Sequence, residues 1–231
     1  MWSNYFLQIR NKYTMRVSTK EPLVINLDGK DVTKDSNINI TDKRKGGFFQ
    51  AFDETAKYFS NKYNCLAFFG ADEISFIFQD PMVLINDINS DGNNYTTEIA
   101  SVFSQMFYDL FNNIYTGYKV YWHTKCFSIK KEKVVSFIKY KSKLFEVLKT
   151  TYFLKRRGIN NPGVINLEEK YKLCRKYEDF ANELDDIKGT LYLSGTKIDL
   201  NEYIKGNIVE RTNNSYDDLD EVEIDFSEII L

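Results

Sequence analysis

The sequence predicts an α+β fold in which an antiparallel sheet of split βαβ order carries helices on one face. Two observations support this prediction. Short apolar runs rich in β-branched and aromatic residues end at turn residues, which is typical of buried strands. Between these runs, apolar residues recur every three or four positions, which is typical of amphipathic helices. The order along the chain is strand, helix, two strands, helix, strand, helix, and this order gives the split βαβ arrangement.

The first half of the sequence supplies a strand, a helix and a hairpin. The apolar run at 23–27 is closed by Asp28-Gly29, which predicts a buried strand that ends in a turn. Residues 48–63 gather phenylalanines and an alanine on one helical face. Residues 65–69 and 74–78 are apolar runs on either side of a tight acidic turn, so we expect a β-hairpin there.

The second half continues with a similar alternation. We expect, in order, a loop at 86–94, a helix at 95–115, a strand at 118–129, a long helix at 131–157, a helix at 167–184 and a strand at 189–200. The break after the long helix separates an expected palm-like domain at 1–160 from a C-terminal extension of helices and strands at 161–231. A ferredoxin-like sheet of this kind is the architecture of polymerase palms and nucleotide cyclases, and also of proteins without catalysis, so the fold alone assigns no function.

Composition and cysteine content exclude several classes of protein. Hydrophobic residues make up 43% and charged residues 28% of the chain, which excludes a mainly disordered protein. No apolar run approaches the ~18 residues that a membrane span needs, so we expect no membrane partner. The three cysteines are far apart and odd in number, which favours reduced thiols in a cytoplasmic protein. The single histidine, His123, excludes zinc sites built on several histidines and disfavours histidine-dependent nucleophilic catalysis.

Charge is unevenly distributed, although the formal net charge is only −2. Basic residues recur from Lys119 to Arg157, where only Glu132 and Glu146 oppose them. After Arg211 the sequence carries many acids and no base. A basic helix of this kind suits contact with a polyanion, although lysines are also common on solvated helix faces.

Two acidic turns are the strongest candidates for chemistry. Asp28 follows the first buried strand, and Asp72-Glu73 occupy the turn of the hairpin. Because the first strand and the hairpin are neighbours in a split βαβ sheet, we expect Asp28 and Asp72 to lie a few ångströms apart. Two carboxylates at that spacing repel each other unless a cation neutralises them. Mg²⁺ is the usual cation, since it takes hard oxygen ligands and leaves room for phosphate oxygens.

Four motifs, taken in order, carry a family resemblance. The first is Leu27-Asp28-Gly29-Lys30, and the second is Asp72-Glu73 with Ser75-Phe76 following. The segments at 125–134 (K-C-F-S-I-K-K-E-K-V) and 7–13 (L-Q-I-R-N-K-Y) complete the set. Together they resemble the tRNA-histidine guanylyltransferase superfamily, and most closely its Thg1-like branch of 3′–5′ nucleotide polymerases. The likeness runs from about residue 5 to about residue 155, with similar spacings.

The resemblance implies a polymerase-palm fold with two Mg²⁺ ions held by Asp28, the Gly29 carbonyl and Asp72. It implies catalytic roles for Asp28 and Asp72, with Glu73 as nearby support. The substrate it implies is a nucleoside triphosphate, GTP or ATP, with the turn from Lys30 to Thr33 cradling the phosphates. The expected nucleotide-binding residues are Gly29, Lys30, Asp31, Val32, Thr33, Lys43, Ala71 and Ser75. RNA phosphates would contact the basic helix through Lys131, Lys133, Lys139, Lys141 and Lys143.

Several residues depart from the family pattern. Asn26 stands where the family has arginine, Ala71 where it has serine, and Thr33 where it has histidine. Residues 93–98 lack the family's basic cluster, and residues 140–149 lack the acid and the second arginine of its helical motif. Most of these positions recognise the triphosphate or the base in the family. The two metal ligands are kept, so we expect phosphoryl transfer on an altered substrate.

Three functions remain open from the sequence. The first is a Mg²⁺-dependent nucleotidyltransferase that adds nucleotides to the 5′ end of a tRNA or another structured RNA. The second is a nucleotide cyclase or oligonucleotide synthase that makes a signalling nucleotide on the same palm. The third is a catalytically degenerate palm that binds RNA or protein. The resemblance also implies a homotetramer or a homodimer.

Overall fold

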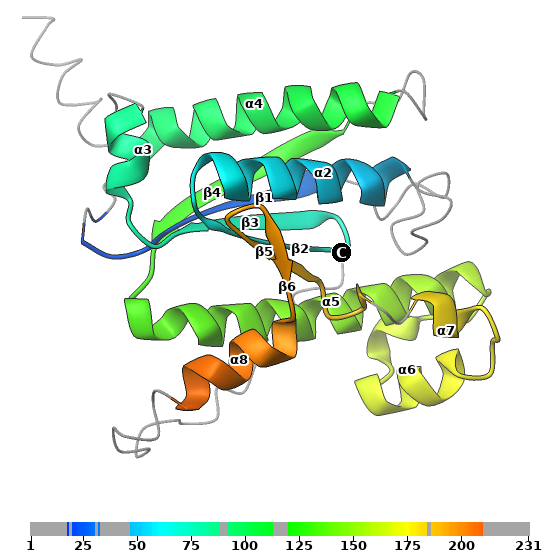
Figure 1. Ribbon diagram of the computed structural model, residues 1–231. Helices are drawn as coiled ribbons and strands as arrows, with labels where there is room; N and C mark the ends of the chain where they lie inside the picture. Colours follow the sequence, from blue (N-terminus) through cyan, green and yellow to red (C-terminus); the bar gives the residue numbers. More distant parts are fainter. Residues whose placement is uncertain are drawn as a thin grey trace, which may run out of the picture.

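The computed structural model describes residues 18, 20–30, 32, 47–87, 92–112, 120–183 and 186–209. Its centre is one antiparallel sheet with helices above and below it (Figure 1). The strands are β1 (Leu23–Lys30), β2 (Leu66–Gly70), β3 (Glu73–Phe78), β4 (Tyr121–Ser128), β5 (Thr190–Leu193) and β6 (Thr196–Ile198). Within the part of the chain described here, no helix is both long and apolar enough to cross a membrane.

The sheet order is β4-β1-β3-β2-β5-β6, and every neighbouring pair is antiparallel. In the first four strands, β3 lies between β1 and β2, which is the split βαβ arrangement. The predicted fold class is therefore confirmed. β5 and β6 widen the sheet beside β2, so residues beyond 160 contribute to the same sheet. The division into domains at residue 160 stays a prediction.

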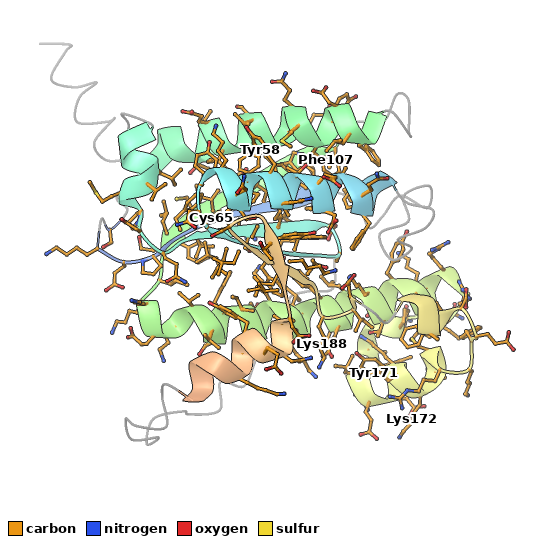
Figure 2. The ribbon with its side chains drawn as sticks, viewed as in Figure 1. Tyr58, Cys65, Phe107, Tyr171, Lys172 and Lys188 are labelled. Carbon is orange, nitrogen blue, oxygen red and sulfur yellow. The ribbon has the colours of Figure 1, made fainter. Side chains whose placement is uncertain are left out.

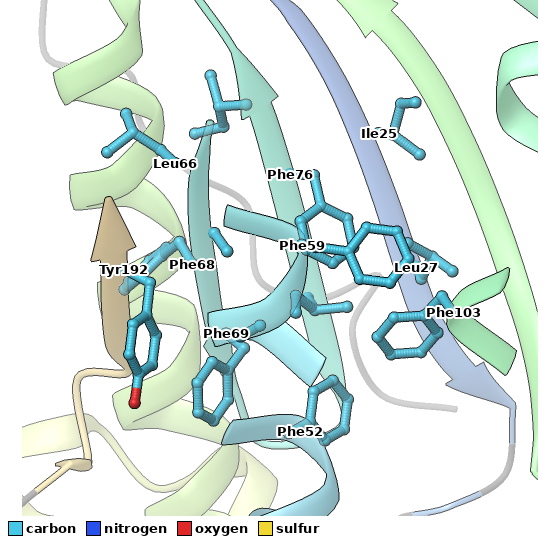
Figure 3. Close-up of a cluster of buried hydrophobic side chains, with 14 of the residues drawn as sticks. Ile25, Leu27, Phe52, Phe59, Leu66, Phe68, Phe69, Phe76, Phe103 and Tyr192 are labelled. Atoms are coloured by element: carbon cyan, nitrogen blue, oxygen red, sulfur yellow. The ribbon is translucent and has the colours of Figure 1, made fainter. Parts of the chain in front are cut away.

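The helices α2 (Gly47–Lys62) and α4 (Gly92–Asn112) cover one face of the sheet. Phenylalanines fill the space between these helices and the strands (Figure 3). The ring of Phe52 stacks on that of Phe69 in β2 with centroids 5.6 Å apart, and Phe59 stacks on Phe76 in β3 at 4.9 Å. Aromatic side chains of this size supply most of the apolar area that a core of this kind buries.

The long helix α5 (Val134–Arg156), which follows the 3₁₀ turn η2 (Lys131–Lys133), lies on the opposite face. This differs from the predicted arrangement with all helices on one face. Successive strand residues point to opposite faces, and Phe68 faces α5, where its ring lies 5.3 Å from that of Phe145. A Cβ on Gly70 or Gly189 would lie within 2.8 Å of the Phe145 ring, so these glycines allow the close approach of α5. The sheet carries apolar side chains on both faces, and this explains why α5 forms a second helical layer.

The C-terminal third differs from prediction in its details. The expected helix at 167–184 is two helices, α6 (Leu167–Cys174) and α7 (Phe180–Glu183), which build a small separate core with the end of α5. The expected strand at 189–200 is the hairpin of β5 and β6, which turns at Ser194-Gly195, where both residues have positive φ. The chain continues into α8 (Leu200–Val209), which contacts α5.

The expected loop at 86–94 is partly helical. It contains the end of α3 (Met82–Asp87) and the start of α4, because α4 begins before the apolar residues that mark its buried face.

All three cysteines are free and buried, and Cys65 lies just before β2 (Figure 2). They are therefore part of the interior, as expected for reduced thiols.

Candidate active site

The site lies where the end of β1 meets the turn between β2 and β3. Asp28 is the cross-strand partner of Glu73, so the two side chains emerge on the same face of the sheet. The backbone amide of Gly29 donates a hydrogen bond of 2.9 Å to the carbonyl oxygen of Asp72. These contacts bring Asp28 and Asp72 together at one edge, as the order of the elements predicts.

Close packing explains why glycine occupies position 29. A Cβ there would lie 2.7 Å from Cγ2 of Val32, 3.3 Å from the carbonyl oxygen of Asp72 and 3.4 Å from the Trp122 ring. The first of these distances is shorter than real Cβ contacts, and the second involves the backbone of the hairpin turn. Glycine thus lets the backbone of β1 approach the hairpin turn closely.

Burial and nearby negative charges raise the pKa values of both aspartates. Desolvation and the nearby charge of Asp28 raise the pKa of Asp72 to about 7, and this residue is only 7% exposed. Desolvation is also the largest cause that raises the pKa of Asp28, followed by the charge of Glu73. Buried carboxylates that lie close to other negative charges favour a bound cation, because a divalent ion compensates both the repulsion and the lost hydration.

The donor set fits Mg²⁺ in its chemistry. Asp28 and Asp72 offer hard carboxylate oxygens, and Mg²⁺ is commonly bound by one or two carboxylates together with waters and substrate phosphates. Among the side chains described in the structure, no group of three or more histidines, cysteines, aspartates and glutamates is arranged to hold a metal. A pair of carboxylates suits an ion that completes its shell with substrate oxygens.

Glu73 has partners of its own. Its Oε1 accepts hydrogen bonds from Asn26 Nδ2 and from Lys141 Nζ, and the lysine forms an ion pair with it. Asn26 also donates to Ser75 Oγ at 2.9 Å and to the carbonyl of Ile74 at 3.3 Å. This buried network between β1, β3 and α5 was not predicted. The alternation of β1 offers the signal, since Asn26 lies two residues before Asp28 and therefore on the same face.

The edge strand β4 adds two basic side chains beside the carboxylates. His123 is the cross-strand partner of Asp28, and Lys125 is that of Asn26. Both side chains are exposed. Each lowers the pKa of Asp28, after Lys141, against the larger effect of burial. The sequence disfavours nucleophilic catalysis by His123, and the register places this residue next to the candidate metal ligand.

The predicted nucleotide-binding residues fall in different surroundings. Lys30 is exposed at the end of β1, whereas Val32 is 2% exposed and packs into the core. Ala71 has a φ of +52°, a left-handed conformation that shapes the turn before Asp72. Ser75 is fully buried against Asn26. The other three expected residues, Asp31, Thr33 and Lys43, lie outside the described residues.

The predicted RNA-binding lysines divide into two groups. Lys131, Lys133, Lys139 and Lys143 are exposed, and Nζ of Lys143 lies 3.3 Å from Oε2 of Glu146. The side chain of Lys141 is 12% exposed and turns toward Glu73. The segment at 7–13 and the acidic tail after Arg211 lie outside the described residues.

Comparisons with known proteins find the same fold. No protein-family model and no curated protein matches the sequence. The structure is similar to a bacterial tRNA(His) guanylyltransferase (Thg1)-like protein in complex with ATP, with a TM-score of 0.61, 15% identity, and 90% of this chain and 99% of that chain covered. A bacterial Thg1-like protein in complex with GTP matches with a TM-score of 0.58, 16% identity and 83% of each chain.

A third solved structure comes from a eukaryote. The tRNA(His) guanylyltransferase of Saccharomyces cerevisiae matches with a TM-score of 0.58 and 19% identity, over 84% of this chain and 94% of that chain. At these identities the likeness establishes the fold. The chain thus has the fold of the Thg1 and Thg1-like proteins, which the sequence motifs predict.

Proposed function

We propose that this protein is a Mg²⁺-dependent nucleotidyltransferase that adds a nucleotide to the 5′ end of a tRNA or another structured RNA. The observation that carries the proposal is the meeting of Asp28 and Asp72 at the hydrogen-bonded contact between β1 and the hairpin turn. The fold around them is that of proteins whose structures contain GTP or ATP. Two adjacent carboxylates at a strand end are suited to phosphoryl transfer assisted by metal ions.

Asp28, the carbonyl oxygen of Gly29 and Asp72 are the groups proposed to hold two Mg²⁺ ions. When bound, these ions would activate a hydroxyl group and stabilise the charge of the leaving phosphate. The protein's own contribution is orientation. The amide of Gly29 donates to the carbonyl of Asp72, and Gly29 is paired with Trp122 of β4, so the backbone that carries the Gly29 carbonyl is held in the sheet.

The direction of addition is part of the proposal. The 3′-hydroxyl of the incoming nucleotide attacks the activated 5′ phosphate of the RNA and releases its activating group. The exposed lysines Lys131, Lys133, Lys139 and Lys143 would hold RNA phosphates on the α5 side of the sheet, in a contact that weakens with salt. A nucleoside triphosphate, GTP or ATP, would lie over the end of β1 beside Lys30. Assembly as a homotetramer or homodimer and a cytoplasmic location stay predictions.

The test uses purified protein, Mg²⁺ and each α-labelled nucleoside triphosphate in turn. One set of reactions contains a tRNA that lacks its 5′ nucleotide, and the other contains no RNA. We expect label in the RNA and its loss in Asp72→Asn. Label in a small product without RNA would instead favour a cyclase or an oligonucleotide synthase. Absence of incorporation with all four nucleotides in both sets would favour a binding palm without catalysis.

A further inference from the structure

We propose that Lys141 is a positioning residue that neutralises Glu73, so that the site presents only the charges of Asp28 and Asp72 to a divalent cation. This inference rests on the proposed function, since it concerns the same site. Sequence reasoning places Lys141 among the RNA-binding lysines. Its contacts assign it to the interior of the site.

The ion pair between Lys141 and Glu73 is largely shielded from solvent. The side chains are 12% and 9% exposed, respectively. Asn26 Nδ2 donates to the same Glu73 oxygen, and Nζ of Lys141 lies 5.7 Å from the centroid of the Phe137 ring. Buried carboxylates are stable as charged groups when they are paired in this way.

The direction of Lys141 follows from its place on α5. Ile138 lies one turn before it and Phe145 one turn after it, and both are fully buried against the sheet. Positions three and four apart share a helix face, so Lys141 belongs to the packed face. Lys139 and Lys143 flank it in sequence and are exposed. A lysine on an apolar helix face needs a buried partner, and Glu73 provides it.

Glu73 would otherwise add a third negative charge to the site. It is the cross-strand partner of Asp28 and the next residue after Asp72. Like charges that close disfavour one another's ionised forms. When Asp28, Asp72 and Glu73 are all ionised, these carboxylates and Lys141 together carry two net negative charges, and removal of the Lys141 charge leaves three. Two carboxylates balance one divalent ion, so a second ion requires the phosphates of the nucleotide.

The test measures nucleotide-free Mn²⁺ affinity, from the electron paramagnetic resonance signal of free Mn²⁺, in the full chain. We expect Lys141→Met to bind Mn²⁺ roughly tenfold more tightly than the wild type, because one extra negative charge faces the ion. Glu73→Gln leaves the lysine charge uncompensated and should bind roughly tenfold more weakly. The double variant Lys141→Met/Glu73→Gln and the conservative variant Lys141→Arg should both stay close to the wild type.

The opposite signs of the two single variants separate charge from structure. If the ion pair were merely structural, its loss would weaken Mn²⁺ binding in both single variants, and that result would overturn the proposal. Equal affinities in all variants would overturn it as well. If Lys141→Met does not fold, Glu73→Gln and the double variant still decide between these outcomes. Lys155→Met, at an exposed position in the last turn of α5, is the matched control and should bind Mn²⁺ like the wild type.

The readout is independent of transfer activity. Charge-dependent Mn²⁺ binding without nucleotide incorporation would contradict the proposed function and leave the role of Lys141 intact. If the protein incorporates nucleotide but its Mn²⁺ affinity does not change when Lys141 is replaced, this inference alone would be contradicted.

Discussion

The amide of Gly29 and the carbonyl of Asp72, joined by a 2.9 Å hydrogen bond, couple the end of β1 to the turn between β2 and β3. This contact lies outside the regular ladder between β1 and β3, which ends at the pair Asp28 and Glu73. It fixes the turn that carries one proposed metal ligand against the strand that carries the other. The spacing of the two residues that carry the carboxylates is thus set by backbone contacts.

Gly29→Ala should disturb this contact. The new Cβ would lie 2.7 Å from Val32 Cγ2 and 3.3 Å from the Asp72 carbonyl, so the backbone must shift. We expect a destabilisation of about 1–3 kcal/mol, as in other overpacked sites, and a fall in nucleotide incorporation of about 10-fold or more. Gly206→Ala on α8 is the control, because nothing lies within 4 Å of its Cβ position. An active Gly29→Ala enzyme would show that the close approach is not needed.

Asp28→Asn and Asp72→Asn should separate activity from stability. Asparagine has nearly the same shape as aspartate but carries no charge for a metal ion. We expect incorporation to fall about 10³-fold, the scale of a lost electrostatic contribution to catalysis. Thermal unfolding without metal should move to a higher Tm near pH 8, since the burial of a charge and the repulsion that raise these pKa values are both relieved. A lower Tm in both variants would contradict this account of the raised pKa values.

Metal-free protein should lose stability as pH rises from about 4 to about 7. The pKa of Asp72 is about 7 in the folded chain, against 3.8 for an unperturbed aspartate. Between these values the folded chain keeps a proton that the unfolded chain has lost, so the free energy of unfolding falls with pH. At about 1.4 kcal/mol for each pKa unit, the loss is on the order of a few kcal/mol.

The matching measurement records Tm against pH in a chelator for the wild type and Asp72→Asn. The two curves should diverge between pH 4 and 7, with the variant falling less. Addition of Mg²⁺ at pH 7.5 should raise the Tm of the wild type and leave that of the variant nearly unchanged. Parallel curves would contradict the assignment of the raised pKa to Asp72.

The exposed lysines before and within α5 should contribute to RNA binding and not to the stability of the fold. Lys131, Lys133 and Lys139 changed together to glutamine should weaken RNA binding and lower the salt slope, by about 0.7 for each lost phosphate contact. The control changes Lys172, Lys176 and Lys205 to glutamine, which are also exposed but lie on or just after α6 and on α8. An equal loss in both triple variants would indicate nonspecific attraction.

Much of the fold follows from local patterns in the sequence. The apolar run at 23–27 becomes the buried part of β1, and the run before Asp72 becomes β2, which is buried throughout. Their order then determines the split βαβ sheet, which places Asp28 near Asp72 without any long-range information. The two carboxylates could therefore be predicted to meet, and their adjacency in the structure agrees with that reasoning.

The rest depends on contacts between residues distant in sequence. The helical pattern of α5 shows an apolar face, but which sheet face it covers depends on Phe68 and Phe145 meeting across a long sequence interval. For the same reason Lys141 resembles its exposed neighbours in sequence, and only the packing of α5 shows that it reaches Glu73. The alternation of β1 places Asn26 on the same face as Asp28, but it does not show which three acceptors Asn26 reaches.

The most direct test of the account uses a nucleoside triphosphate labelled at its γ-phosphate, with a 5′-triphosphorylated RNA as acceptor. In 3′–5′ addition, the 3′-hydroxyl oxygen of the nucleotide bonds to the 5′ α-phosphorus of the RNA, its proton passes to solvent, and pyrophosphate leaves from the RNA. The γ-label therefore stays in the RNA, and Asp72→Asn should abolish it. Extension of the RNA with release of the γ-label as pyrophosphate would contradict the proposed direction, and no extension would contradict the proposed function.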